Sequence, residues 1–277
     1  MDSEPIAGIP SRVWAGSAPA PASGIIARTE TGLALETVLV PGRAVALVPE
    51  QIGSGPQSWR ESCGKTQLAV SLAHFLWKAG AADVVIWVTA TSRAAVLSSY
   101  VEAAAALDIQ LSGDADSVCT RLLGWLRDTS RPWLVVLDGL TAGAALDDRL
   151  WPAGPAGRVL VTTSDAETMR RRDARVVPVG PFSRREALTY LIGRLTADLD
   201  QRQGAIDLVG ELENEPMALA MASAVIASSE LTCHDYREHY TGRRDQVIAA
   251  SSGGEPAAVR QRRPRAQRCS HVISPCR

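Results

Sequence analysis

The sequence predicts an α/β fold in which a parallel sheet, with helices on both faces, is followed by a small helical domain. Continuous apolar runs alternate with helical patterns as far as residue 181, which is typical of parallel strands covered on both sides. Beyond residue 181 only helical patterns remain. Between the first strong strand pattern and a helix lies Gly64-Lys65-Thr66, the ending of a phosphate-binding loop.

The first part of the chain justifies this fold class element by element. Residues 1–23 are rich in Pro, Ala, Ser and Gly and predict a flexible leader. A short helix is expected at Thr31–Leu39, followed by a strand at Ala44–Val48. An amphipathic helix is expected at Lys65–Trp77, where Leu68, Leu72, Phe75 and Leu76 share a stripe.

The alternation then continues to the end of the predicted α/β domain, residues 24–181. Further strands are expected at Val84–Val88, Trp133–Leu137, Arg158–Thr162 and Arg175–Pro178, with helices at Arg93–Leu107 and Ser117–Arg127.

A helical domain is predicted for residues 182–249. Ser183 and Glu186 have the spacing of a capping box and open a helix that runs to Leu195. Further helices are expected at Gln203–Leu212, Pro216–Ile226 and Cys233–Tyr240. Residues 250–277 carry many arginines without apolar periodicity and predict a disordered tail. The alternatives are a nucleic-acid-binding arm, or a truncated chain whose tail is not native coding sequence.

Composition excludes several function classes. The net charge of -1 gives no overall electrostatic attraction for nucleic acid or an anionic membrane, so neither is expected as a partner. No apolar run approaches the roughly 20 residues of a membrane-spanning helix. The N-terminus also lacks the basic start and apolar core of a signal peptide, so a cytoplasmic protein is expected.

The strongest functional signal is the loop that ends in Gly64, Lys65 and Thr66. Lysine places a positive charge near the β- and γ-phosphates, backbone N–H groups at the helix start surround the oxygens, and the threonine hydroxyl can ligate Mg²⁺. The predicted nucleotide-binding residues of the loop are Cys63, Gly64, Lys65, Thr66 and Gln67. The first glycine of the motif is replaced by Trp59, and Glu61 adds negative charge, so an ordinary lysine at a helix start is the alternative.

Two strand ends downstream carry polar residues. Asp138 follows the apolar strand 133–137, where P-loop enzymes hold Mg²⁺ through a carboxylate, and Thr66 and Asp138 are the predicted magnesium ligands. The alternative for Asp138 is a helix or turn cap. At the next strand end, Thr163 and Ser164 face either the ligand crevice of the sheet or cap the helix that starts near Asp165. No residue is assigned a catalytic role.

Together these segments resemble the NB-ARC group of STAND signal-transduction ATPases, which are P-loop NTPases, and in particular their actinobacterial members. The similarity covers about residues 24–249 and is carried by short matching segments in the same order. These segments are Ile26–Arg28, Gly64–Ala69, Val85–Val88, Leu134–Asp138, Val159–Thr163 and Glu215–Ala220.

The resemblance implies a switch that binds ADP in a locked state and ATP in a released state. It implies that Arg28 lies against adenine and that Pro216 approaches the bound nucleotide. It also shows departures from the family pattern: Gly139 stands in place of a second acid, and Ser164 in place of the arginine that senses the γ-phosphate. Arg170–Arg172 lie nearby, and a solvated basic face is expected there rather than a substitute for that arginine.

The sequence therefore predicts an ATP- or ADP-binding regulatory module with Mg²⁺ as a cofactor and at most slow ATP hydrolysis. A protein partner or self-association is expected. A second hypothesis is a degenerate interaction scaffold that binds no nucleotide, favoured by the apparent insertion Gly53–Glu61 in the phosphate loop. A small-molecule kinase is the weakest alternative, because the helical domain does not fit it.

Overall fold

The structure, a computed structural model, describes residues 11–22, 24, 26, 28–50, 63–141 and 146–251. The chain divides into two compact units, Met1–Tyr236 and Arg237–Arg277. The first unit contains the described strands together with the helices up to residue 227, so the domain boundary near residue 181 stays a prediction. The predicted tail lies outside the described residues, apart from its first two, which end helix α10 (Cys233–Ser251).

In the part of the chain that the structure describes, six parallel strands form one sheet in the order β1-β3-β4-β5-β2-β6. Their bounds are β1 Val13–Ala15, β2 Arg43–Pro49, β3 Val84–Thr89, β4 Trp133–Leu140, β5 Gly157–Thr163 and β6 Arg175–Val179. The pairing is parallel throughout, and its register shifts once, between Leu137 and Leu140 of β4. All five predicted strands are present, and the sheet has a sixth.

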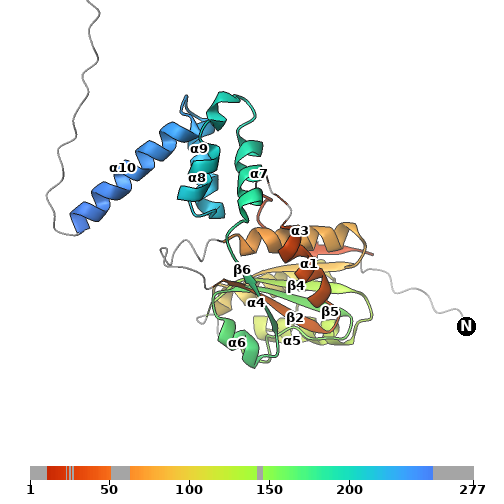
Figure 1. The fold of residues 1–277 in the computed structure, drawn as a ribbon. Coiled ribbons are helices and arrows are strands. Elements are labelled where there is room, and N and C mark those ends of the chain that lie inside the picture. The colour runs from red at the N-terminus through yellow and green to blue at the C-terminus, as the bar shows by residue number, and fades with distance from the viewer. Residues whose placement is uncertain are drawn as a thin grey trace, which may run out of the picture. The chain divides into compact units, whose positions relative to one another are not determined.

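Helices cover both faces of this sheet (Figure 1). One face carries α1 (Thr29–Val38) and α3 (Lys65–Lys78), whose buried residues pack in one apolar cluster with the strands. The other carries α4 (Arg93–Ala106), α5 (Ala115–Asp128) and α6 (Ala166–Arg171). The predicted fold class, an α/β domain with helices on both faces followed by a helical part, is confirmed.

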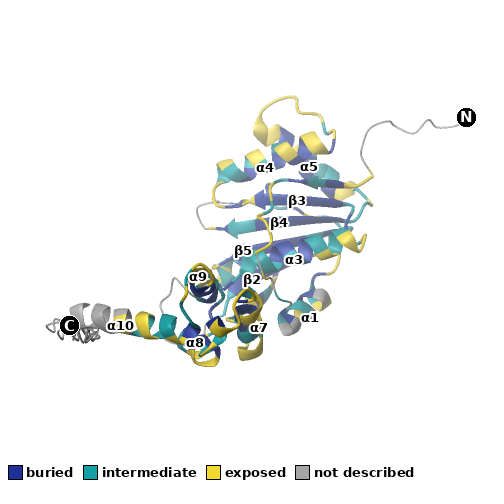
Figure 2. Ribbon diagram, turned by 90° about the horizontal axis from the view of Figure 1, so that it is seen from above, coloured by how far each residue is buried: buried dark blue, intermediate teal, exposed yellow. Residues whose placement is uncertain are grey.

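Because helices pack on both faces of the sheet, its central strands appear in the sequence as continuous apolar runs. Along β3, Ile86 belongs to the core on the α4–α5 side, whereas its neighbour Trp87 belongs to the core on the α3 side. Successive side chains of a strand point to opposite faces, so every residue of such a strand must be apolar. Figure 2 shows these central strands as the buried layer between the helices.

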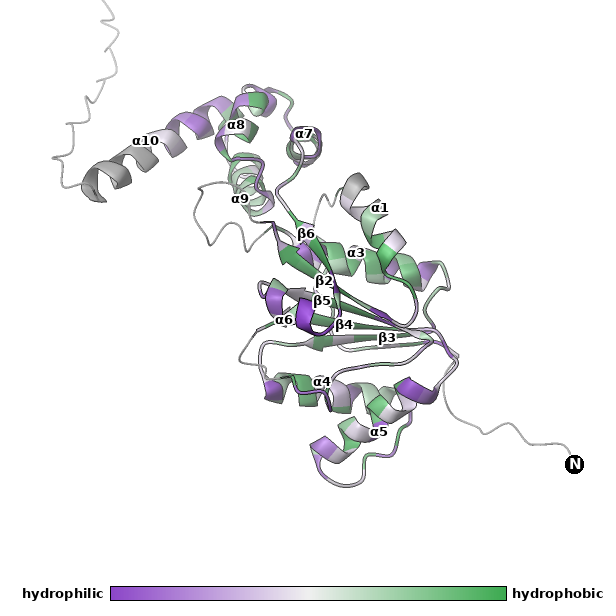
Figure 3. Cartoon of the chain, turned by 60° about the horizontal axis from the view of Figure 1, so that its bottom comes forward, coloured by the Kyte–Doolittle hydropathy of each residue, from purple (hydrophilic) through white to green (hydrophobic). Residues whose placement is uncertain are grey.

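The helical part begins at α7 (Arg184–Arg194) with the predicted capping box. The Ser183 N–H donates to Glu186 Oε2 at 2.8 Å, and the Glu186 N–H donates to Ser183 Oγ at 3.3 Å. A 3₁₀ turn (η2, Asp200–Arg202), α8 (Ala205–Glu211) and α9 (Pro216–Ala227) follow. Helix α10 extends well past the predicted end at Tyr240, and the part of it that is coloured in Figure 3 consists largely of hydrophilic residues.

One part of the leader prediction was wrong. Val13–Ala15, within the segment predicted to be flexible, form β1 and pair with Val84–Ile86 of β3. Val13 and Ala15 are buried in the core on the α4–α5 side. Three residues are too few to show a strand period, and the pairing depends on a neighbour some 70 residues away in the sequence.

Candidate functional site

The carboxyl ends of β2, β4 and β5 lie next to one another and define the candidate site. Adjacent strands β2 and β5 are followed by helices on opposite faces of the sheet, α3 and α6. Such a reversal opens a crevice at the carboxyl ends of the strands, where ligands of open α/β sheets bind. The residues predicted from the phosphate-loop motif and from the strand ends therefore meet at one edge.

The end of the phosphate loop has the backbone that a helix start needs. Gly64 has φ +87°, a left-handed conformation that favours glycine, and its carbonyl accepts the N–H of Leu68 at 3.0 Å. Lys65 is the first residue of α3. The Lys65 Nζ lies 3.9 Å from Sγ of the buried Cys63, whose thiol pKa is raised by burial. The predicted insertion, including Trp59 and Glu61, lies outside the described residues.

The two predicted magnesium ligands are in direct contact. The Thr66 hydroxyl donates to Asp138 Oδ1 at 2.7 Å, so the helix after the loop and the end of β4 meet here. The Thr162 hydroxyl donates to the same oxygen at 2.6 Å and accepts the N–H of Gly139 at 2.7 Å. Asp138 is therefore oriented toward the site rather than capping a helix.

A hydroxyl and a carboxylate are hard oxygen donors of the kind Mg²⁺ takes, with water and phosphate oxygens completing its shell. Thr66 and Asp138 thus fit a magnesium ion held by one carboxylate. Among the described residues, no group of three or more His, Cys, Asp or Glu side chains could hold a metal by itself.

Arg28 holds three segments together. Its side chain is nearly buried, at 9% exposure, with Nη2 donating to the Cys63 carbonyl at 2.8 Å and Nη1 to the Gly180 carbonyl at 2.9 Å. The guanidinium lies 4.7 Å from the ring centre of Phe182. Burial lowers the pKa of Arg28, while nearby Cys63, Glu186 and Glu215 act to raise it. Arg28 therefore braces the loop residue that precedes Gly64.

An apolar cavity of about 480 Å³ lies beside the start of α3. It is lined by the predicted nucleotide residues Arg28, Gly64, Gln67 and Pro216, together with Ala22, Ile26, Gly32, Leu35, Leu68, Ser71, Leu72, Phe75, Phe182, Tyr190, Met217 and Ala220. Four residues chosen from the sequence thus surround one space, between α1, α3, α7 and α9. The aromatic side chains of its wall were not predicted, because nothing in their spacing indicates a binding wall.

At the end of β5, different residues face the ligand site and cap the following helix, the two alternatives that the sequence left open. Thr162 faces the site through Asp138, whereas the helix cap is Asp165, whose carboxylate accepts the Thr168 N–H at 2.9 Å. Thr163 donates to the Leu140 carbonyl at 2.7 Å and is structural. Ser164 is exposed and caps nothing. A ligand-facing role was one of the two alternatives predicted for this strand end, but Thr162, the residue that contacts Asp138, was not predicted individually.

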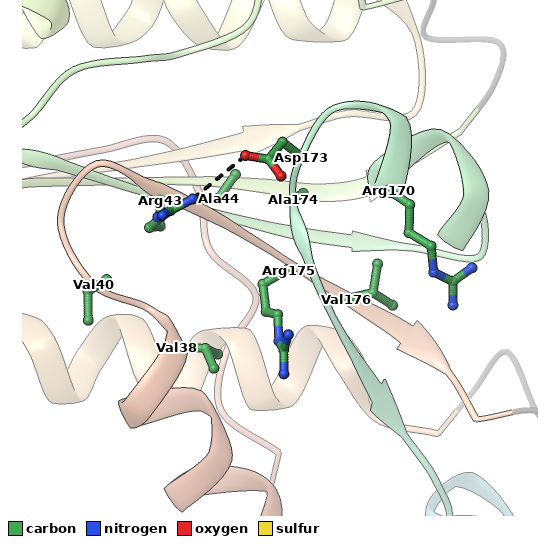
Figure 4. Close-up of a pocket in the computed structure, with 9 residues that line it drawn as sticks. All are labelled: Val38, Val40, Arg43, Ala44, Arg170, Asp173, Ala174, Arg175 and Val176. Atoms are coloured by element: carbon green, nitrogen blue, oxygen red, sulfur yellow. Dashed lines mark ion pairs between the residues drawn. The ribbon is translucent and has the colours of Figure 1, made fainter.

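The arginines after β5 are far from the loop. Arg171 pairs with Glu167, and Arg172 with Asp148. Arg170 lines a second, basic hollow of about 650 Å³ (Figure 4). This hollow is lined by Val38, Val40, Arg43, Ala44, Arg170, Asp173, Ala174, Arg175 and Val176.

The basic hollow lies at the end of the sheet opposite to the candidate site, because Arg43 and Arg175 begin β2 and β6. Its one ion pair in Figure 4, Arg43 to Asp173 at 3.6 Å, joins side chains that are 64% and 96% exposed and contributes little stability. Arg170 and Arg171 are exposed, as expected, whereas the expectation of a solvated face is wrong at Arg172, whose side chain is 21% exposed and lies 4.8 Å from the ring centre of Trp151. Arg170, at this opposite end of the sheet, is not placed to sense a γ-phosphate.

Comparison with known proteins adds a likeness of low similarity. No family model and no curated protein matches the chain. Among solved structures, Cdc6p of Pyrobaculum aerophilum has a TM-score of 0.47 and 14% identity over 90% of this chain and 66% of its own. The ADP form of the Aeropyrum pernix ORC2 protein has a TM-score of 0.39 and 15% identity over 92% of this chain and 68% of its own. Likeness at this level carries no conclusion about ligand or activity.

The described part of the chain contains no helix with both the length and the apolar character that crossing a bilayer requires.

Proposed function

We propose that this chain is a nucleotide-binding regulatory module that takes ATP or ADP together with Mg²⁺. The observation that carries the proposal is the contact between the Thr66 hydroxyl and Asp138 at 2.7 Å, directly after Gly64 and Lys65. It joins a loop ending to a strand-end carboxylate across 72 residues of sequence, as a magnesium–phosphate site requires.

The apolar cavity supports the second half of the proposal. An adenine base is flat and largely apolar, and binding sites for such groups are concave, mostly apolar and edged by a few polar groups. The cavity begins at Gly64 and is walled by Phe75, Phe182 and Tyr190. A mononucleotide whose phosphates lie at Lys65 would therefore have space for its base beside the same helix start.

The finer proposal is a switch of the NB-ARC type with weak or absent hydrolysis. Gly139 and Ser164 supply neither a carboxylate to polarise water nor a cation for the γ-phosphate. A switch acts through what it binds in one state and not in the other, so a protein partner or self-association belongs to this proposal. Arg28, Lys65, Thr66, Asp138 and Pro216 are the proposed contacts.

Isothermal titration of the full chain with Mg-ADP and Mg-ATP tests the proposal. We expect micromolar dissociation constants, equivalent to about −8 kcal/mol. Lys65→Ala removes a charge-assisted contact with the phosphates, and a loss of about 3 kcal/mol weakens binding roughly a hundredfold. Lys78→Ala, at the exposed far end of the same helix, is the matched control. Failure of the wild-type chain to bind either nucleotide would refute the proposal and favour the degenerate scaffold.

A further inference from the structure

The N-terminal segment, residues 11–22, is fixed to the far end of α3. Arg12 donates to the Trp77 carbonyl and lies 3.9 Å from the ring centre of that residue. Trp14 stacks on His74 with ring centres 4.8 Å apart, and the strand that contains it pairs with β3. These contacts fix the segment near the C-terminal end of the helix.

The other end of the segment is held near the start of α3 by one side chain. The Ala22 N–H donates to Gln67 Oε1 at 2.7 Å, and Gln67 Nε2 donates to the Ala20 carbonyl at 3.3 Å. The two bonds fix the orientation of the amide, since an N–H group needs the oxygen and a carbonyl needs the nitrogen. Both the oxygen and the nitrogen of the Gln67 amide are therefore bonded to the backbone of the N-terminal segment.

This contact places the N-terminal segment at the apolar cavity. Ala22 and Ile26 line the cavity together with Gly64, Leu68 and Pro216. From Gln67 to Trp77 the helix rises about 15 Å, a distance that the nine residues from Trp14 to Ala22 span easily. The segment therefore runs along α3 and ends as part of the cavity wall.

We propose that Gln67 is a positioning residue: it seats Ala20–Ala22 against α3, so that the N-terminal segment completes the ligand cavity and controls release of what binds there. The identity of the ligand as an adenine nucleotide rests on the proposed function. Gln67 was predicted from the phosphate-loop motif as a nucleotide-binding residue, whereas in the structure its amide is turned toward the segment. The seated segment forms part of the wall that a bound ligand would contact. A ligand therefore stabilises the seated segment, and the seated segment slows release of the ligand, because such coupling is reciprocal.

Hydrogen exchange of the full chain, followed by mass spectrometry, tests the seating. In Gln67→Leu, exchange in Gly16–Ala22 is expected to become about fivefold faster, the factor that corresponds to one ordinary hydrogen bond. Pro19 and Pro21 carry no amide hydrogen, so Ala22 contributes much of the signal. Gln110→Leu, the same substitution at an exposed position between α4 and α5, is the control and should match the wild-type chain. Equal exchange in Gln67→Leu and the wild type would overturn the proposal.

The coupling is tested by the same measurement with saturating Mg-ADP. The ligand is expected to slow exchange in Gly16–Ala22 of the wild type severalfold and to have less effect in Gln67→Leu, from which ADP dissociates about fivefold faster. If Gln67→Leu weakens ADP binding without changing exchange in Gly16–Ala22, Gln67 contacts the nucleotide directly and the proposal fails.

Failure of the proposed function would be visible separately. If the wild-type chain binds no nucleotide, 1-anilinonaphthalene-8-sulfonate, a dye that fluoresces when it binds apolar surface, reports access to the cavity instead. Its fluorescence is expected to rise at least twofold in Gln67→Leu, and an unchanged signal would overturn the proposed control of access.

Discussion

Replacement of Arg28 by alanine should destabilise the fold more than replacement of any exposed arginine. The guanidinium is nearly buried, and its two terminal nitrogens donate to the carbonyls of Cys63 and Gly180. Arg28→Ala removes both bonds and the contact with Phe182. It leaves two carbonyls that lie in different segments of the chain without their donors.

The expected magnitude follows from these contacts. A hydrogen bond from a charged donor contributes about 1.5–3 kcal/mol, and a partly desolvated cation–π contact about 1 kcal/mol. Arg28 also lines the apolar cavity, so water can reach the vacated site and satisfy part of the loss. We therefore expect a net loss of about 3 kcal/mol, which lowers the Tm of a chain of this size by about 10 °C.

Thermal unfolding followed by circular dichroism measures this loss. Arg170→Ala is the matched control, because Arg170 is exposed on α6, and its Tm should stay within about 2 °C of the wild type. Arg28→Lys keeps a charge but presents a single ammonium, so about half of the loss is expected. Equal Tm values for Arg28→Ala and Arg170→Ala would refute the claim that Arg28 stabilises the fold by joining these segments.

Two further predictions concern glycines and are measured by urea unfolding. Gly157→Ala should lower the free energy of unfolding by about 3 kcal/mol, because its Cβ would lie 1.9 Å from the ring of Trp133. The control is Gly124→Ala in α5, whose Cβ meets nothing within 4 Å and which should raise the free energy of unfolding by up to about 1 kcal/mol. A smaller loss for Gly157→Ala than for a typical surface variant would contradict this. Gly139→Ala should cost about 1 kcal/mol, since φ is +70° there, and an unchanged midpoint would show that the left-handed backbone is not required.

The sequence predicted the central strands and most helices because their signals are local. A strand covered on both faces needs apolar residues at every position, and Trp133–Leu137 and Val84–Val88 show this directly. The capping box of α7 is equally local, since Ser183 and Glu186 are three residues apart. Strand β1 had no such local signal, because its three residues form a strand only by pairing with the edge of β3.

Of the contacts within the site, the meeting of Thr66 and Asp138 could be predicted from the sequence, whereas the contacts of Arg28 and Gln67 could not. The motif places Lys65 and Thr66 at a helix start, and the strand ending places Asp138 at a sheet edge, so their meeting could be expected. The role of Arg28 could not, because its partners lie 35 and 152 residues away. Gln67 likewise bonds to a segment 45 residues earlier, in a part of the chain predicted to be flexible.

If a single ligand occupies both the phosphate-loop side and the apolar cavity of the candidate site, each side restricts the chemistry of that ligand. At one side of Gly64, Lys65 and the Thr66–Asp138 pair require a ligand with anionic oxygens that can also ligate a hard cation. At the other side, the cavity between Leu68, Phe182 and Pro216 requires an apolar body. A free inorganic phosphate satisfies only the first requirement and an apolar metabolite only the second. Since both features adjoin the same residue, the proposed ligand, a nucleoside polyphosphate with Mg²⁺, would meet both requirements together.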